Sequence, residues 1–332
     1  MTNFYKIMFF NLLIISTLIV ISSYSWFSVW MGLEMNLVAM IPLIFKNKNI
    51  ITTEAAFKYF MIQSIASSIL LLSFISSENF FNSNLDWINS FNLLLLESSL
   101  LMKLGMAPFH SWFPEVSQGI DWMSCLILFT WQKIAPMTLL SLISKFSNII
   151  ILTLIISSIV SGIGGINQNS IRKILAYSSI NHMTWMLMSM QSKLMIWFNY
   201  WTIYTMMNIF IVKLLEKSQI LYLTQINQMN MKLMLKLLLF LNLISMGGIP
   251  PMIGFLPKWL VISWLMNSES FLIPFIIIIF TLIPIFFYLQ ISFSTLMLKS
   301  TKTKLNLMNH STSMAMLNFL FLFSLPLMMM MF

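Results

Sequence analysis

Apolar stretches of about 20 residues recur along the whole chain, separated only by short clusters of Asn, Ser, Lys and Pro. Each stretch is long enough for one helix to cross the hydrocarbon core of a bilayer. Charged residues make up only 8% of the chain, whereas soluble domains contain about 25%. The sequence therefore predicts an integral membrane protein with an all-α, polytopic fold.

The apolar stretches predict about eleven transmembrane helices. The fourth and ninth are long and interrupted, so we expect two inverted five-helix repeats, each with a broken fourth helix, followed by a C-terminal helix. The predicted domains are residues 1–145, residues 146–298, and a loop with the last transmembrane helix at 299–332. The predicted spans are 4–22, 26–44, 56–76, 91–117, 122–144, 149–166, 171–190, 195–215, 235–265, 271–297 and 313–331.

Loop charges divide between the two sides of the membrane when the spans are taken alternately. Because Lys and Arg accumulate on the inner side, the N-terminus is predicted inside and the C-terminus outside. The net charge of +9 is explained by this orientation, and no nucleic acid partner is expected. The inner side would carry Lys46, Lys48, Arg172, Lys173, Lys217, Lys232, Lys236, Lys299, Lys302 and Lys304, and the outer side Glu78, Asp86 and Glu269 with Lys145 and Lys193.

Four charged residues lie within the predicted spans: Glu34, Lys103, Lys133 and Lys258. A lone ion at the bilayer centre costs about 2.5–3.5 kcal/mol on insertion scales, and such residues commonly mark ion or proton pathways. Burial disfavours the charged form of a lysine and a nearby carboxylate favours it, so a lysine can load and release a proton as its partner moves. We therefore predict a proton relay, with Glu34 as the partner of Lys103 and Lys133 as the middle group.

Helix-breaking residues accompany two of these lysines. Proline removes a backbone donor, and freed backbone groups at membrane depth survive only where protein or a hydrated cavity satisfies them. Two broken helices that run in opposite directions are typical of inverted-repeat transporters. The breaks are predicted at Gly105 and Pro108 beside Lys103, and at Gly247, Gly248, Pro250, Pro251 and Gly254 beside Lys258.

Less specific signals leave alternatives open. His182 lies in a polar run of the seventh span and could relay protons because histidine titrates near neutral pH, but it could also be a packing residue. Glu34 and Lys103 could form a static ion pair, and Lys133 could bond a broken-helix carbonyl for structural reasons. Glu97, six residues before Lys103, is a candidate local partner of that lysine.

A metal or redox centre is not expected in the chain. The three histidines, His110, His182 and His310, lie on separate segments without the spacing of paired ligands. The single cysteine, Cys125, excludes a disulfide framework and a four-thiolate iron–sulfur cluster. Any redox chemistry is therefore expected in partner proteins.

Three motifs resemble a known family. They read KLGMAPFHSWFPEV from Lys103, LAYSSINHM from Leu175 and GGIPPMIGFLPKW from Gly247. They are similar, in order and over nearly the whole chain, to the subunit 2 family of NADH dehydrogenase, which are antiporter-like membrane subunits of respiratory complex I. The resemblance implies a part in coupling electron transfer from NADH to ubiquinone to proton pumping from matrix to intermembrane space.

The resemblance also implies roles for residues and partners. Glu34 and Lys103 would form the switching pair, Lys133 the connecting relay and Lys258 the terminal site. NADH, FMN, iron–sulfur clusters and ubiquinone would be bound by other subunits. Expected partners are the other membrane-arm subunits and the lipid bilayer, with cardiolipin as a candidate lipid.

The expected location is the inner mitochondrial membrane, with the N-terminus in the matrix and the C-terminus in the intermembrane space. The skewed composition, with 31 Met and Arg172 as the one arginine, agrees with an organellar genome. Two other functions stay open. A free-standing cation/proton antiporter would need a carboxylate cluster that the spans lack, and a purely structural subunit would keep its buried charges as packing pairs.

Overall fold

The computed structural model describes residues 2–45, 49–79, 86–143, 147–228, 233–267, 272–297 and 312–324. Within these ranges the chain is helical throughout apart from turns and one isolated bridge between Ser170 and Tyr222, as the sequence predicts for the fold class. Several predicted loop charges lie outside the described residues, as does the end of the last predicted span from residue 325. These charges are Lys46, Lys48, Lys145, Lys232, Glu269, Lys299, Lys302 and Lys304.

Six of the described helices are long and apolar enough to cross a membrane. Two shorter apolar helices, Leu235–Gly247 and Phe255–Met266, lie on either side of the interruption in the ninth predicted span. The chain is therefore a multi-pass helical membrane protein, and the total of eleven spans stays a prediction. The six segments are Phe4–Ser22, Trp26–Ile44, Ile50–Ser77, Trp122–Ile143, Asn148–Ile166 and Leu272–Phe293.

The chain divides into two compact units, Met1–Thr153 and Leu154–Phe332. Helix α8 (Asn148–Ile166) begins in the first unit and ends in the second. The other elements of the first unit are α1 (Thr2–Ser22), α2 (Trp26–Ile44), α3 (Ile50–Asn79), α4 (Asp86–Leu104), α5 (Trp112–Gly119), α6 (Trp122–Thr130), the 3-10 turn η1 (Trp131–Lys133) and α7 (Ile134–Ile143). Those of the second are α9 (Ile171–Ser192), α10 (Leu194–Ser218), α11 (Leu223–Gln228), α12 (Leu233–Gly247), α13 (Phe255–Asn267), α14 (Leu272–Met297) and α15 (Thr312–Leu322).

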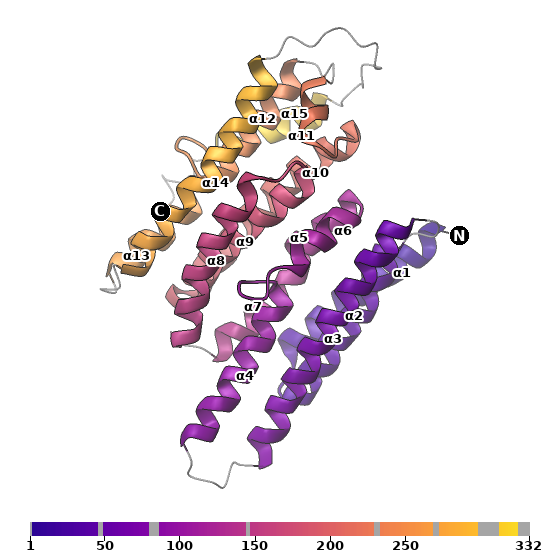
Figure 1. Ribbon diagram of the computed structural model, residues 1–332, viewed down its shortest axis with the longest axis vertical. Coiled ribbons are helices and arrows are strands. Elements are labelled where there is room, and N and C mark those ends of the chain that lie inside the picture. The colour runs from indigo at the N-terminus through magenta and orange to yellow at the C-terminus, as the bar shows by residue number, and fades with distance from the viewer. Residues whose placement is uncertain are drawn as a thin grey trace. The chain divides into compact units, whose positions relative to one another are not determined.

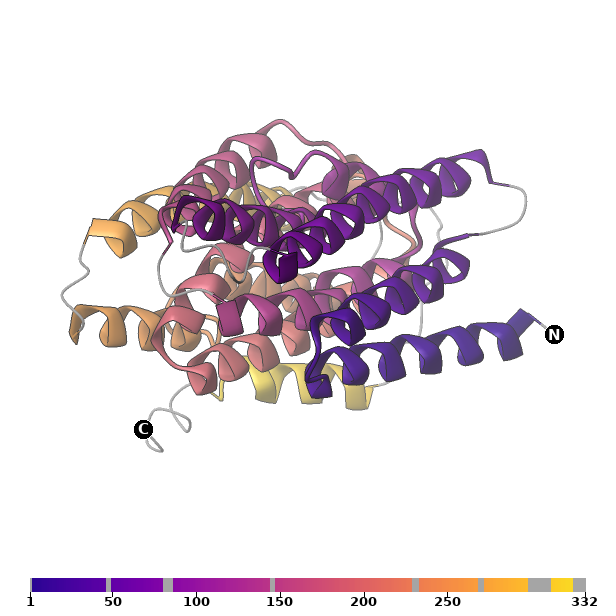
Figure 2. The ribbon, with the colours of Figure 1, turned by 90° about the horizontal axis from the view of Figure 1, so that it is seen from below.

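In the first unit, α1 and α2 run side by side, and α3 packs against both α2 and α4 (Figures 1 and 2). Gly32 permits the close approach of α1 and α2, because a Cβ there would lie 2.7 Å from Val20 Cγ2 and 3.2 Å from the carbonyl oxygen of Ser16. Small residues serve this purpose in membrane helix pairs. Helix α3 thus connects α4 to the packed pair α1 and α2.

Serine and threonine hydroxyls inside the helices bond to their own backbone. Ser16 and Thr17 of α1 donate to the carbonyls three residues earlier, each at 2.8 Å, and Ser178 and Ser179 of α9 do the same at 2.8 Å. Such back-bonding satisfies the hydroxyl without water. The polar residues of these helices are thereby accommodated in an apolar environment.

In the second unit, α9 is buried over most of its length and packs against α10 and α13. Helix α12 packs against α10, α14 and α15. Gly164 near the end of α8 contacts the ring of Tyr177 so closely that no Cβ would fit. This packing places the polar run of α9 inside the unit, where it faces α10.

Candidate functional site

Helix α4 ends in a C-terminal motif that depends on glycine. Gly105 follows the helix with φ of 72°, a conformation that favours glycine. The N–H groups of Gly105 and Met106 donate to the carbonyls of Met102 and Leu101, both at 3.1 Å, which is the Schellman pattern. The motif places Lys103 in the last turn of α4, directly before the chain leaves the helix.

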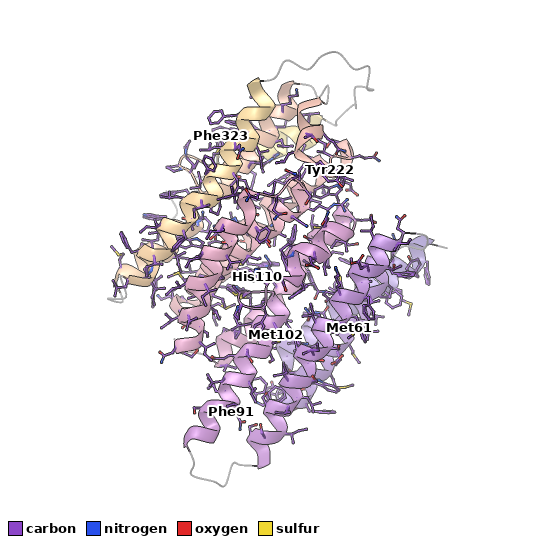
Figure 3. All side chains as sticks on the ribbon, in the orientation of Figure 1. Met61, Phe91, Met102, His110, Tyr222 and Phe323 are labelled. Carbon is purple, nitrogen blue, oxygen red and sulfur yellow. The ribbon has the colours of Figure 1, made fainter. Side chains whose placement is uncertain are left out.

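The chain then runs through His110 into α5, and Figure 3 shows Met102 and His110 on either side of this connection. Lys103 is buried, with 7% of its surface exposed. Its carbonyl accepts a hydrogen bond from Gln63 Nε2 of α3 at 3.2 Å, which satisfies one of the carbonyls that a helix end leaves free. A neighbouring helix therefore fixes the backbone of Lys103, and the residue lines a cavity of the first unit.

Glu34 of α2 is half-buried and lies within electrostatic reach of Lys103. In the described part of the chain no direct ion pair joins these two side chains, although Lys58 forms close ion pairs with carboxylates. A static Glu34–Lys103 ion pair is therefore not the arrangement in the structure. The two charges act on one another at a distance.

Lys103 and Lys133 line one cavity in the first unit. The cavity offers about 20 Å³ in which a water molecule can be centred, and about 10–15 Å³ is enough for one water. Three amide side chains line it beside the lysines, and the remaining wall is mainly apolar and aromatic. The lining residues are Leu33, Asn36, Leu37, Tyr59, Gln63, Lys103, Leu104, Trp112, Phe113, Leu128, Gln132, Lys133 and Pro136.

The fifth predicted span is not a continuous helix. The 3-10 turn η1 separates α6 from α7 and contains Lys133, where the sequence predicts an unbroken helix over 122–144. Lys133 is 2% exposed, and its Nζ lies 6.0 Å from the ring centroid of Phe113 in α5, a distance that permits a cation–π contact. Short 3-10 segments within helices often mark functional positions.

An amide pair joins this turn to α2. Gln132 Nε2 donates to Asn36 Oδ1 at 2.9 Å, and Asn36 is buried. We expect Gln132→Leu to destabilise the chain by about 1–3 kcal/mol, because it leaves the Asn36 carbonyl oxygen buried without its partner. The measurement is the midpoint temperature of thermal unfolding of the purified protein. The double variant Asn36→Leu/Gln132→Leu should recover part of the loss, and equal loss in single and double variants would contradict the pairing.

The second break is built around Lys258 in the first turn of α13. Its Nζ donates to the carbonyl of Gly247, the last residue of α12, at 2.7 Å. Gly248 has φ of 79°, and a Cβ at that position would lie 2.9 Å from Lys258 Cδ and Nζ. Lys258 is 7% exposed. Lys258 thus bonds a carbonyl at the end of a broken helix, which is the kind of structural role that the sequence also left open for Lys133.

The two breaks share one backbone pattern. In each, a glycine with positive φ is followed three residues later by a proline after a cis peptide bond, and nine residues later by a second proline. The next residue is acidic in the first break and basic in the second. The matching residues are Gly105, Pro108, Pro114 and Glu115 in the first break, and Gly248, Pro251, Pro257 and Lys258 in the second.

The acidic member of this pattern has a different environment. Glu115 Oε2 accepts from Lys58 Nζ of α3 at 2.9 Å, and Lys58 also pairs with Glu54 at 2.8 Å. The Glu115 and Glu54 side chains are about half exposed or more, at 52% and 61%. This triad therefore anchors α5 to α3 at the surface, away from the polar interior.

His182 forms a polar cluster with α10 in the second unit. Its Nδ1 lies 2.9 Å from Tyr200 Oη, and its ring centroid lies 4.9 Å from that of Tyr204. One turn along α9, Trp185 lies under the Lys258 amine, with Nζ 5.9 Å from the ring centroid. Since residues three apart share a helix face, α9 presents His182 and the Lys258 contact on one side.

Sequence reasoning missed the neutral partners of these charges. Gln63, Asn36, Gln132 and Tyr200 all contact the cavity or His182, and only their polarity within apolar spans could have marked them. The structure places Lys103 and Lys133 on one cavity in the first unit, and in the second it places Lys258 against Trp185, one turn from His182 on α9. Among the described residues, no group of three His, Cys, Asp or Glu side chains is placed to hold a metal ion.

Fold and site together define a class of protein: a polytopic helical membrane protein that buries lysines at interrupted helices. The family described as NADH:quinone oxidoreductase/Mrp antiporter, TM matches residues 23–284. Respiratory complex I from Thermus thermophilus contains a chain of the same fold, with a TM-score of 0.85 and 18% identity, covering 98% of this chain and 78% of that one.

Sequence relatives narrow the class. The chain is 46% identical over 304 residues to NADH-ubiquinone oxidoreductase chain 2 of Anopheles gambiae, covering 91% of this chain and 89% of the relative. It is 40% identical over 299 residues to the same protein of Locusta migratoria, covering 89% and 86%. The chain belongs to the NADH-ubiquinone oxidoreductase chain 2 family.

Proposed function

We propose that the chain is a proton-translocating membrane-arm subunit of NADH:ubiquinone oxidoreductase, coupling electron transfer from NADH to ubiquinone to proton pumping. The observation that carries the proposal is the placement of two buried lysines, Lys103 and Lys133, on one cavity beside a broken helix. Buried ionisable side chains are costly in a membrane and commonly lie on proton pathways.

In the first unit, Lys103 is the switching group. Glu34 influences it from a distance, so a small change in their separation alters how strongly the charged lysine is stabilised. The cavity has room for water between Lys103 and Lys133. A proton released by Lys103 passes through this water to Lys133. Lys133 lies in the 3-10 turn that separates α6 from α7.

In the second unit, Lys258 is the terminal group. Its bond to the last carbonyl of α12 holds the amine at the carboxyl end of that helix. His182 and Tyr200 provide a neighbouring pair that can accept and donate protons. Proton exchange between this pair and Lys258 takes place along the α9 face that carries Trp185.

The finer architecture belongs to the same proposal. The glycine and proline spacing that the two breaks share supports inverted repeats at 1–145 and 146–298, followed by a C-terminal segment at 299–332. We assign NADH, FMN, iron–sulfur clusters and ubiquinone to other subunits, and the other membrane-arm subunits and the bilayer, with cardiolipin as a candidate, as partners. The location is the inner mitochondrial membrane, with the N-terminus in the matrix and the C-terminus in the intermembrane space.

The test is Lys103→Ala in the assembled complex. We expect the amount of complex to stay normal while coupled NADH oxidation falls about tenfold or more, because a positioned proton-transfer group contributes on that scale or above. The measurement is the proton-to-NADH ratio in sealed vesicles together with the amount of complex. Normal pumping with normal assembly would refute the relay, and reduced assembly with intact pumping per complex would favour the structural alternative.

A further inference from the structure

One buried carboxyl has no part in the relay described above. Glu97 of α4 is 0% exposed. Its Oε2 accepts a hydrogen bond from Ser147 Oγ at 2.7 Å, and its Oε1 is buried without a hydrogen bond in the described part of the chain. A buried carboxylate with a single neutral donor keeps most of its desolvation cost.

Glu97 does not serve as the partner that the sequence suggested for Lys103. Six residues along an α-helix correspond to about 9 Å of rise and to different faces of the helix. Its recorded partner is Ser147, at the start of α8, and no ion pair joins it to Lys103 among the described residues. The carboxyl is therefore separate from the switching pair.

Ser147 fixes one oxygen of the carboxyl and leaves the other free. The Ser147 hydroxyl accepts from the N–H of Ile150 at 3.3 Å, as an N-cap residue does. Its single proton is directed to Glu97 Oε2, so Oε2 acts as an acceptor whether or not the carboxyl is protonated. Oε1 can then gain or lose a proton without breaking the contact between α4 and α8.

We propose that Glu97 is a proton-binding site of the first unit, which takes up a proton at Oε1 and releases it at the end of the unit where α8 begins. This inference rests on the proposed function. The step is a proton transfer alone, from carboxylate to carboxylic acid and back. The loop charges predict that α8 begins on the outer side of the membrane, so the site would connect the buried part of α4 with that side.

The first experiment is Glu97→Gln in the complete complex. Glutamine keeps a carbonyl oxygen to accept the Ser147 bond and resembles the protonated acid, but it cannot release a proton. We expect normal assembly and a fall in coupled NADH oxidation of about tenfold or more. A purely structural Glu97 predicts unchanged pumping. Glu115→Gln makes the same substitution at an exposed carboxyl and should leave both assembly and pumping unchanged.

The second experiment needs no variant. A hydrophobic carbodiimide reacts with protonated carboxyls in apolar surroundings, and peptide mass spectrometry of the native complex locates the label. We expect label on Glu97 and none on Glu54 or Glu115, which are paired with Lys58. If Glu97→Gln fails to assemble, the labelling of the native complex still shows whether Glu97 binds a proton.

The two proposals fail separately. Normal pumping by Glu97→Gln, or an unlabelled Glu97, would overturn the Glu97 site even where Lys103→Ala abolishes pumping. Normal pumping by assembled Lys103→Ala would instead overturn the relay itself.

Discussion

Gly254→Ala is expected to prevent the chain from accumulating in an assembled complex. A Cβ at this position would overlap the carbonyl oxygen of Ser245, and that carbonyl also accepts from the N–H of Gly248 at 3.0 Å. Backbone cannot move aside as a flexible side chain can, so we expect a cost of about 3 kcal/mol or more. The measurement is the steady-state amount of the chain in the complex on native gels.

The matched control is Gly247→Ala, seven residues earlier at the same break. The nearest atom to a Cβ there is Ile285 Cγ1 at 3.3 Å, which belongs to a side chain that can adjust. We expect nearly normal accumulation of this variant. If both variants accumulated normally, the close contact between Gly254 and the carbonyl of Ser245 would not exist in the membrane-embedded protein.

Lys258→Met is expected to abolish most of the coupled NADH oxidation. Methionine fills much of the volume of the lysine stem beside Gly248, but it can neither carry a proton nor donate to the carbonyl of Gly247. We expect the rate of coupled NADH oxidation in sealed vesicles to fall about tenfold or more. Assembly should fall only partly, because one unpaired carbonyl costs about 1–3 kcal/mol.

Lys58→Met is the control for the loss of a lysine. Lys58 is paired with two carboxylates at the surface of the first unit, and exposed ion pairs contribute little to stability. Pumping and assembly should therefore stay close to normal. Equal losses in the two variants would show that any removed lysine harms the complex, and the special position of Lys258 would be disproved.

Much of this site could be predicted from the sequence because charge and helix-breaking residues are rare in apolar spans. Lys103, Lys133 and Lys258 stand out as ions within such spans, and all three are buried. The helices end at Leu104 and Gly247, at the glycines and prolines that the sequence singled out. These features are local, so a reader of the sequence can find them without knowing the packing.

The partners of these residues could not be predicted, because they depend on which helix faces meet. Nothing near Ser147 in the sequence indicates that it bonds Glu97, fifty residues earlier. Gln63 reaches the carbonyl of Lys103 from another helix. The 3-10 turn at Lys133 was missed for another reason. Pro136 has no N–H to donate to the carbonyl of Gln132, four residues earlier, so it disfavours an α-helix at the turn. Hydropathy alone does not register this effect and predicted one continuous span.

The hydroxyls of α9 that bond to their own helix backbone lower the cost of placing serine and threonine in a lipid bilayer. Thr184 and Ser189 donate to carbonyls of their own helix at 2.6 Å, as Ser178 and Ser179 do at 2.8 Å. A residue-by-residue hydropathy scale counts each of these hydroxyls as if it still had to find a partner. The free energy of moving such a helix into the bilayer is therefore more favourable than a hydropathy scale predicts. Exchanging these serines for alanines should alter membrane integration little.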